Sequence, residues 1–285
     1  MTDIKNVTVL GTGVLGSQIA YQVAFSGFAV TAYDISDEIL EKATERFAGL
    51  AATYKKDGVA GAADGGADAA LGRIRYSSDL ADAVRDADLV IEAIPEVLAL
   101  KQETYEKLGA VAPAKTIFAT NSSTLLPSAM KDFTGRPAKF LALHFANRIW
   151  ISNTAEVMGT PDTDPAVFDE VVAFAGEIGM VAIPIHKEKA GYVLNSLLVP
   201  FLGAALELAA DGYAEPADID RVWKIGAGAP LGPFQYYDII GLTTPYNIMS
   251  HGDATARRHA AWLKENYIDK GKLGIASGEG FYTYG

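Results

Sequence analysis

Residues 7–16 read VTVLGTGVLG, a short apolar run followed by three glycines in the spacing Gly-x-Gly-x-x-Gly. The run VTVL predicts a buried strand, and the glycines are typical of a turn into a helix that receives a dinucleotide. Gly11 permits the tight turn, Gly13 lets the backbone approach a pyrophosphate, and Gly16 lets helix and strand pack closely. The helix N-terminus then offers free N–H groups to the phosphates. This stretch therefore predicts the first βα unit of a doubly wound fold.

Asp34 follows the next apolar run, residues 29–33, and lies 18 residues past Gly16. A carboxylate at this place accepts hydrogen bonds from both hydroxyls of the adenosine ribose and repels the additional phosphate of NADP. The spacing therefore predicts NAD as the cofactor. The alternative is that Asp34 only caps the helix that begins near Ser36 or Asp37.

The first half of the chain alternates β-branched runs with amphipathic stretches, which favours a mainly parallel sheet with helices on both faces. The predicted strands are Val7–Leu10, Ala29–Tyr33, Leu89–Ala93, Thr116–Thr120, Phe140–His144 and Met180–Ile185. The predicted helices between them include Ser17–Phe25, Glu38–Leu50 and Lys101–Val111. The chain after residue 185 is helical. We therefore expect a Rossmann-like domain at residues 1–186 and an all-α domain at residues 187–285.

The amino-acid composition excludes several kinds of partner and site. Lys and Arg total 24 against 35 Asp and Glu, which gives a net charge of −11. Because such a chain repels phosphate backbones, we expect no nucleic acid partner. The absence of cysteine excludes disulfides, thiolate zinc sites and a cysteine nucleophile, and the sequence suggests no metal site. The start MTDIKNVTVLG lacks the layout of a signal peptide, so we expect a soluble, cytoplasmic protein.

Two segments have unusual compositions. Residues 192–210 are long and apolar, but polar residues and a proline interrupt them. We expect a buried helix at the core or at a subunit interface rather than a membrane span. Residues 60–70 read AGAADGGADAA, and this low complexity predicts a flexible tip between two helices.

His144, one of four histidines, ends the apolar run LALH. In doubly wound sheets ligands bind at the carboxyl ends of the strands, so this imidazole is expected to face the cofactor crevice. Glu156 follows twelve residues later. A carboxylate against an imidazole fixes its tautomer and stabilises the imidazolium, as a general base requires. The alternatives are a structural histidine and a surface glutamate.

Several motifs in order give the chain a resemblance to a known family. They are GTGVLG with Asp34, IEAIPEVLALKQE at 91–103, TNSST at 120–124, LHFAN at 143–147, AEVM at 155–158, GYVLN at 191–195 and EPADIDRVWKIGAGAPLGPFQYYDIIGL at 215–242. The chain resembles the 3-hydroxyacyl-CoA dehydrogenase family nearly end to end. It is most similar to the short two-domain bacterial members, the 3-hydroxybutyryl-CoA dehydrogenases.

The resemblance implies roles for four residues. His144 would take the proton of the substrate 3-hydroxyl, with Glu156 as its orienting partner. Ser123 would bond the reacting oxygen, and Asn195 would bond the same region from the second domain. Ser123 and Asn195 could instead cap helices. The cofactor contacts expected from the glycine motif and the resemblance are Gly11, Gly13, Val14, Leu15, Gly16, Asp34, Ala93, Ile94, Glu96, Lys101, Asn121, Ser123 and Asn147.

The substrate side departs from the family pattern. After LHFAN the family continues with an aromatic-Asn-Pro turn, whereas this chain has Arg148 and Trp150. These two side chains either recognise the substrate at the mouth of the cleft or are structural. Lys55 and Lys56 fall where family members bring basic residues toward the CoA phosphates, although the following segment is acidic.

The expected activity is NAD-dependent interconversion of a short (S)-3-hydroxyacyl-CoA and its 3-oxoacyl-CoA. One alternative is a dehydrogenase of free 3-hydroxy acids, similar to the L-gulonate 3-dehydrogenase group, with Arg148 receiving the carboxylate. Another is a non-catalytic NAD-binding protein. The resemblance also implies a homodimer formed through the helical domain.

Overall fold

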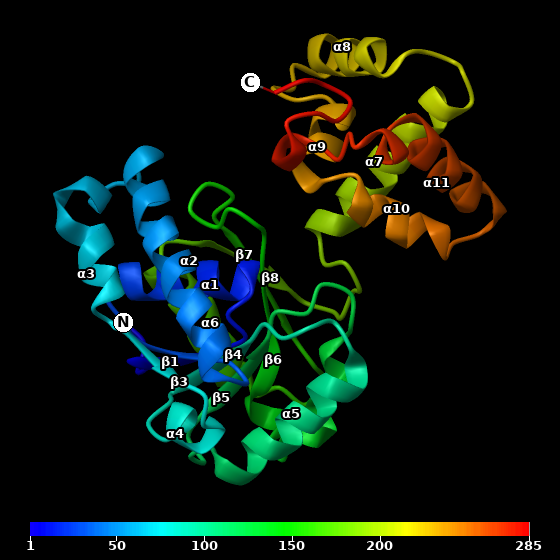
Figure 1. The fold of residues 1–285 in the computed structure, drawn as a ribbon. Helices are drawn as coiled ribbons and strands as arrows, with labels where there is room; N and C mark the ends of the chain where they lie inside the picture. Colours follow the sequence, from blue (N-terminus) through cyan, green and yellow to red (C-terminus); the bar gives the residue numbers. More distant parts are fainter. Residues whose placement is uncertain (285) are drawn as a thin grey trace. The chain divides into compact units, whose positions relative to one another are not determined.

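The computed structural model describes residues 1–284, which divide into two compact units, Met1–Val193 and a unit that starts at Leu194 (Figure 1). The sequence places this boundary earlier, after residue 186. The segment between the two positions packs with the first unit, because Lys189 donates its backbone N–H to Met158 and Val193 donates its own to Glu156.

An eight-stranded sheet forms the centre of the first unit, in the order β3-β2-β1-β4-β5-β6-β7-β8. Its strands are β1 (Asn6–Leu10), β2 (Ala29–Tyr33), β3 (Ile74–Ser77), β4 (Leu89–Glu92), β5 (Ile117–Thr120), β6 (Phe140–Phe145), β7 (Thr154–Gly159) and β8 (Val181–Ile185). Neighbouring strands are parallel except β6 and β7, which are antiparallel. The predicted doubly wound, mainly parallel sheet is confirmed.

Helices cover both faces of this sheet (Figure 1). They are α1 (Val14–Phe25), α2 (Asp37–Lys56), α3 (Ala67–Leu71), α4 (Leu80–Val84), α5 (Leu98–Val111) and α6 (Pro165–Glu177), with short 3-10 turns η2 (Pro127–Ala129), η3 (Lys131–Thr134) and η4 (Pro137–Lys139). Side chains cap the starts of some of these helices: Ser36 accepts the N–H of Ile39 at α2, and Asp164 accepts the N–H of Ala166 before Pro165 at α6.

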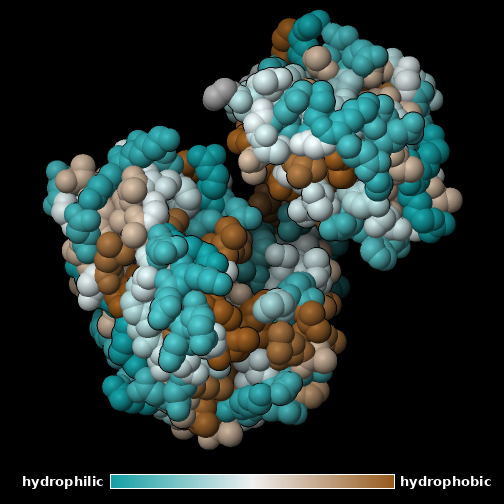
Figure 2. Space-filling model, viewed as in Figure 1, coloured by the Kyte–Doolittle hydropathy of each residue, from teal (hydrophilic) through white to brown (hydrophobic). Residues whose placement is uncertain are grey.

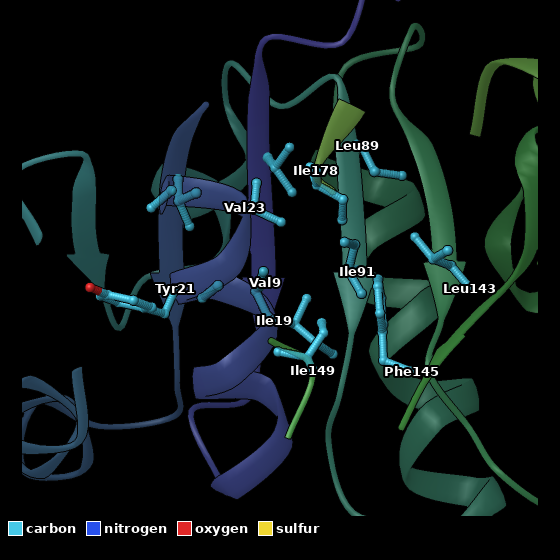
Figure 3. Close-up of a cluster of buried hydrophobic side chains, with 14 of the residues drawn as sticks. Val9, Ile19, Tyr21, Val23, Leu89, Ile91, Leu143, Phe145, Ile149 and Ile178 are labelled. Atoms are coloured by element: carbon cyan, nitrogen blue, oxygen red, sulfur yellow. The ribbon is translucent and has the colours of Figure 1, made fainter. Parts of the chain in front are cut away.

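Alternation along the strands separates two cores. Val9 of β1 and Ile91 of β4 point toward α1, where Ile19 and Val23 meet them (Figure 3). Val90, the residue before Ile91 in β4, points to the other face of the sheet and belongs to the second core, which packs against α4 and α5. Strands that are buried on both faces of a parallel sheet are apolar along their whole length. For this reason the apolar runs in the sequence predict these strands.

Two strands have no counterpart in the sequence prediction. β3 is a four-residue strand at the edge of the sheet with polar residues in its sequence IRYS. β7 contains Glu156 in its buried interior, so its sequence TAEVMG does not read as an apolar run. This buried carboxylate interrupts the apolar pattern and so obscures the strand that carries it.

The predicted connection between two helices at residues 60–70 is shorter in the structure, because residues 67–70 belong to α3 itself. The turn η1 (Ala62–Gly66), whose backbone is non-helical at Asp64 and Gly65, leads into α3. Ala62, Ala67 and Ala70 are fully buried, and the hydroxyl of Tyr21 in α1 donates to the carbonyl of Ala67 at 2.8 Å. Small residues occur here because helix backbones approach closely, so low complexity reflects tight packing.

The second unit consists of helices around its own apolar core. They are α7 (Leu194–Ala210), α8 (Pro216–Ala227), α9 (Pro233–Ile240), α10 (Thr243–Ser250) and α11 (Ala254–Asn266), with the 3-10 turns η5 (Ile268–Lys270) and η6 (Ile275–Ser277). Leu206, Phe234 and Leu263 are completely buried. Hydrophilic residues cover most of its surface in the view of Figure 2. No helix within residues 1–284 is long and apolar enough to cross a membrane.

Replacing Ala70 by leucine tests the packing of α3. The side chain has no space at this fully buried position, so we expect a loss of about 1–3 kcal/mol in the free energy of unfolding, measured by urea denaturation. The neighbouring Ala69 is exposed, so Ala69→Leu should change it by less than about 0.5 kcal/mol. Equal, small effects of the two variants would contradict the packed arrangement.

Candidate active site

The glycine loop lies between β1 and α1, at the point where the strand order reverses between β1 and β4. Gly11 has φ +91°, and a β-carbon there would lie 2.6 Å from the carbonyl oxygen of Ala93. A β-carbon at Gly16 would collide with the carbonyl of Gly11. Gly13 has open space around its missing side chain. The first and third glycines thus allow packing, and the second leaves the helix N-terminus accessible to a pyrophosphate.

Asp34 follows β2 and is tied to the glycine loop. Its Oδ2 accepts the backbone N–H and the hydroxyl of Thr12 at 2.8 and 2.7 Å, and its Oδ1 accepts the N–H of Ile35 at 2.9 Å. Ser36, rather than Asp34, caps α2. A carboxylate oxygen accepts two hydrogen bonds, so Oδ1 retains capacity for a ribose hydroxyl. These residues fit the adenosine half of NAD.

His144 and Glu156 face each other across the antiparallel pair β6 and β7, where they occupy directly opposed positions. Directly opposed side chains in such a pair are close neighbours on one face of the sheet. His144 Nδ1 lies 3.0 Å from Glu156 Oε2, and both side chains are 5% exposed. An ionised carboxylate only accepts hydrogen bonds, so Nδ1 carries a proton and Nε2 lies at the opposite end of the ring.

Ser123 lies at the other end of the imidazole, with its Oγ 3.1 Å from His144 Nε2. Ser123 is in the loop after β5, at the carboxyl edge of the sheet, and is partly exposed. The result is a linear series of serine, histidine and glutamate. Such an arrangement can pass a proton between Nε2 and an oxygen beside Ser123.

Glu96 holds the serine loop. Its Oε1 accepts the hydroxyl of Ser122 at 2.6 Å, the N–H of Ser123 at 3.1 Å and the N–H of Thr124 at 2.9 Å. Burial by itself raises the pKa of Glu96, but hydrogen bonds from Ser122 and Thr124 and the charge of Lys101 outweigh it and lower the pKa to about 2. Glu96 therefore stays ionised at neutral pH and keeps the loop in place.

Lys101 is 1% exposed and forms an ion pair at 2.5 Å with Glu92, which is completely buried. Its ammonium also lies 3.4 Å from Glu96 Oε2. Glu92 further accepts the hydroxyl of Thr120 at 2.8 Å. Sequence reasoning found Lys101 but missed Glu92, because its position within an apolar strand gives no sign of its partner.

Tyr192 was also missed. Its ring stacks on the imidazole of His144 at a centroid distance of 4.3 Å, with 11° between the planes. In sequence it belongs to the apolar run that starts α7, so periodicity alone assigns it to a helix core.

Two family models match the chain along almost its whole length. Residues 6–189 match the NAD binding domain of 3-hydroxyacyl-CoA dehydrogenase, and residues 191–284 match the C-terminal domain of the same family. The chain belongs to the 3-hydroxyacyl-CoA dehydrogenase family. It is an NAD-dependent oxidoreductase, in agreement with the glycine loop and Asp34.

Relatives of this dehydrogenase cover its full length. Human mitochondrial hydroxyacyl-coenzyme A dehydrogenase is 35% identical over 99% of this chain and 91% of its own. A probable 3-hydroxybutyryl-CoA dehydrogenase of Bacillus subtilis is 33% identical over 99% of this chain and 98% of its own. A solved structure of a diketoreductase that acts on dicarbonyl compounds is 68% identical, with a TM-score of 0.97 over 100% of both chains.

The remaining expected cofactor residues of this dehydrogenase surround the same edge of the sheet. Ala93 and Ile94 follow β4, and Lys101 also donates to the carbonyl of Ile94 at 3.3 Å. Asn121 is buried, and its side-chain oxygen accepts the N–H of Phe145 at 3.0 Å. Asn147 is exposed in the loop after β6.

The expected substrate residues come from several segments of the chain. Lys55 pairs with both carboxylate oxygens of Asp68 at 2.8 Å, and Lys56 is exposed. Arg148 is exposed with φ +61°. The indole N–H of Trp150 donates to Asp57 at 2.8 Å and its ring packs on Tyr54, which favours the structural interpretation of Trp150. Asn195 lies in the first turn of α7, in the second unit. No group of three or more His, Asp or Glu side chains among residues 1–284 could hold a metal ion.

Replacing Gly13 by alanine tests the pyrophosphate contact. A methyl group there meets no protein atom within 4 Å, so the melting temperature should not change, while the Kd for NADH should rise by about tenfold because the methyl occupies the phosphate cradle. Fluorescence titration with NADH measures this. Gly16→Ala is the contrasting variant, because its methyl collides with backbone and should lower the melting temperature. Unchanged NADH affinity in Gly13→Ala would contradict the assignment.

Proposed function

We propose that this dehydrogenase reduces the C3 ketone of a short-chain 3-oxoacyl-CoA to the (S)-3-hydroxyacyl-CoA, and oxidises the latter in reverse, with His144 as the acid and base. The observation that carries the proposal is the series Ser123–His144–Glu156 at the carboxyl edge of the sheet, on the same unit as the glycine loop. A buried imidazole with a carboxylate on one nitrogen and a hydroxyl on the other is suited to proton transfer.

The residues have separate tasks in this mechanism. NAD(H), when bound, supplies or accepts the hydride at C3. In reduction, His144 donates its Nε2 proton to the ketone oxygen, while the Ser123 hydroxyl donates a hydrogen bond to the same oxygen. In oxidation, Nε2 takes the proton of the 3-hydroxyl. Glu156 stabilises the imidazolium form in both directions, because its carboxylate stays bonded to Nδ1–H.

Replacing His144 by glutamine tests the acid and base. A positioned general acid or base contributes roughly 10²- to 10⁴-fold in rate, so kcat should fall by at least about 100-fold. The Kd for NADH should stay within about twofold, because the glycine loop and Asp34 are unchanged. His259 is equally buried, at 5% exposure, and lies in the second unit, so His259→Gln is the matched control and should keep kcat. Wild-type turnover in His144→Gln would remove His144 from the mechanism.

The substrate class has a second candidate. A 3-oxoacyl thioester carries carbonyls at C1 and C3, so it is itself a 1,3-dicarbonyl compound. The 68% identical relative is a diketoreductase that acts on dicarbonyl compounds. Here Lys55 is paired with Asp68, so it is not a free cation for CoA phosphates. These facts favour reduction of a free dicarbonyl as the alternative; a free 3-hydroxy acid held by Arg148 is the third possibility.

NADH oxidation at 340 nm separates these substrates. We expect rapid oxidation with acetoacetyl-CoA and slower oxidation with pentane-2,4-dione or acetoacetate, and no comparable rate with NADPH because Asp34 repels its additional phosphate. Turnover with the diketone but not the thioester would overturn the CoA assignment and favour the diketoreductase activity. Turnover with acetoacetate alone would make Arg148→Met the next variant.

We further propose that Asn195 bonds the substrate oxygen region, and that the helical domain forms a homodimer. The support for Asn195 is its motif GYVLN and its position three residues after Tyr192 in the chain. The support for the dimer is the family resemblance together with exposed apolar side chains on α7 and α8, such as Leu197, Val222 and Ile225. The cytoplasmic location stays a prediction from the sequence.

A further inference from the structure

Tyr192 has an unusual backbone for a residue with a bulky side chain. Its φ is +53°, in the left-handed region, and it follows Gly191, whose φ is +80°. Among residues 1–284 only Tyr192 and Arg148 combine a side chain with positive φ. The tyrosine is also 1% exposed. A left-handed backbone at a buried aromatic residue persists only where surrounding contacts enforce it, and such residues concentrate at functional sites.

Three contacts place this short segment around the imidazole. The Tyr192 ring lies flat on His144, at 4.3 Å. The Tyr192 hydroxyl donates to the carbonyl of Ser122 at 2.7 Å. The next residue, Val193, donates its backbone N–H to Glu156 Oε1 at 2.9 Å. The segment therefore contacts the imidazole, its carboxylate partner and the residue before its serine partner.

These contacts support the face of the imidazole, which the hydrogen bonds of His144 do not. Glu156 and Ser123 bond the two nitrogens at the edge of the ring, so neither contact lies against a face of the imidazole and opposes its tilt. A parallel aromatic ring against one face opposes that tilt. Burial and the nearby carboxylates of Glu96 and Glu156 raise the pKa of the Tyr192 hydroxyl, so it stays protonated and remains a donor to Ser122.

We propose that Tyr192 is a positioning residue that holds the imidazole of His144 in line with Ser123 and Glu156, with its left-handed backbone as the device that brings the ring to this face. The inference rests on the proposed function of His144. The ring provides the main effect and the hydroxyl a smaller one, because the ring contacts the imidazole directly while the hydroxyl acts through the loop at Ser122.

Three variants separate these contributions. Tyr192→Met keeps an apolar side chain without a flat ring, and Tyr192→Asn suits the left-handed backbone without a ring. In both we expect kcat to fall by about 10- to 100-fold, with KM and the Kd for NADH within about threefold, because a misaligned base affects proton transfer more than binding. Tyr192→Phe keeps the ring and should retain at least a third of kcat.

Tyr21 provides the matched control. It is a completely buried tyrosine of the same unit, and its hydroxyl also donates to a backbone carbonyl, that of Ala67. Tyr21→Leu should lower the melting temperature while kcat stays within about twofold. A comparable loss of kcat in Tyr21→Leu, wild-type kcat in the ringless variants, or failure of both ringless variants to fold would overturn the proposal and assign Tyr192 a structural role.

A measurement that does not depend on turnover separates this inference from the proposed function. The Nδ1–H proton of His144 bonded to Glu156 should give a downfield proton NMR signal, identified by its loss in His144→Gln. We expect the signal to persist in Tyr192→Phe and to broaden in Tyr192→Met and Tyr192→Asn, because the freed ring exposes this proton to exchange. If His144→Gln retains activity, the base assignment fails, and this signal still decides whether Tyr192 orders the ring. A sharp signal in the ringless variants would overturn the inference.

Discussion

The antiparallel pairing of β6 with β7 is the constraint on which the site depends. Every other neighbouring pair in the sheet is parallel, and at this one place the chain reverses so that His144 and Glu156 become directly opposed. Opposed residues share a face of the sheet, and the same alternation buries their neighbours Leu143 and Val157 in the core on the other face. The distance between the imidazole and the carboxylate is thus set by rigid strands, which keeps the geometry without relying on mobile loops.

Charges on β4, on α5 and in the loop between them support the loops around this pair. The buried Glu92 and Lys101 neutralise each other, and the Lys101 ammonium also lies near Glu96. The Glu96 carboxylate accepts hydrogen bonds from the loop that carries Ser123. A buried ion pair contributes little net stability, but removal of one partner leaves an uncompensated charge, which costs about 3–5 kcal/mol. The pair is therefore better understood as fixing the loop geometry than as stabilising the fold. Sites built for hydride and proton transfer need this fixed alignment more than they need additional affinity.

The family assignment and the substrate question concern different parts of the molecule. The glycine loop and Asp34 fit an NAD-dependent oxidoreductase, and the proposed proton transfer gives Ser123, His144 and Glu156 a role in the same reaction. The substrate side differs from the family pattern at Arg148 and Trp150, and Trp150 is held by Asp57 as part of the packing around α2. A 3-oxoacyl thioester and a free diketone present the same reacting carbonyl, so both fit the same acid and base.

The sequence by itself determined the doubly wound fold, the NAD-binding domain and the place of His144 at the end of a strand. These features are local: strand runs are apolar when both faces are buried, and the glycine spacing encodes a turn whose steric limits do not depend on distant residues. The sequence only suggested Glu156 as the partner of His144, and the tertiary structure decided that the two side chains meet. The structure alone decided that Glu92 neutralises Lys101, that Tyr192 stacks on the imidazole, and that Ala62, Ala67 and Ala70 are buried. Each of these depends on which residues meet across the sheet or between helices. One-dimensional patterns report the burial of a side chain but not its partner, because the partner is chosen by strand register and packing.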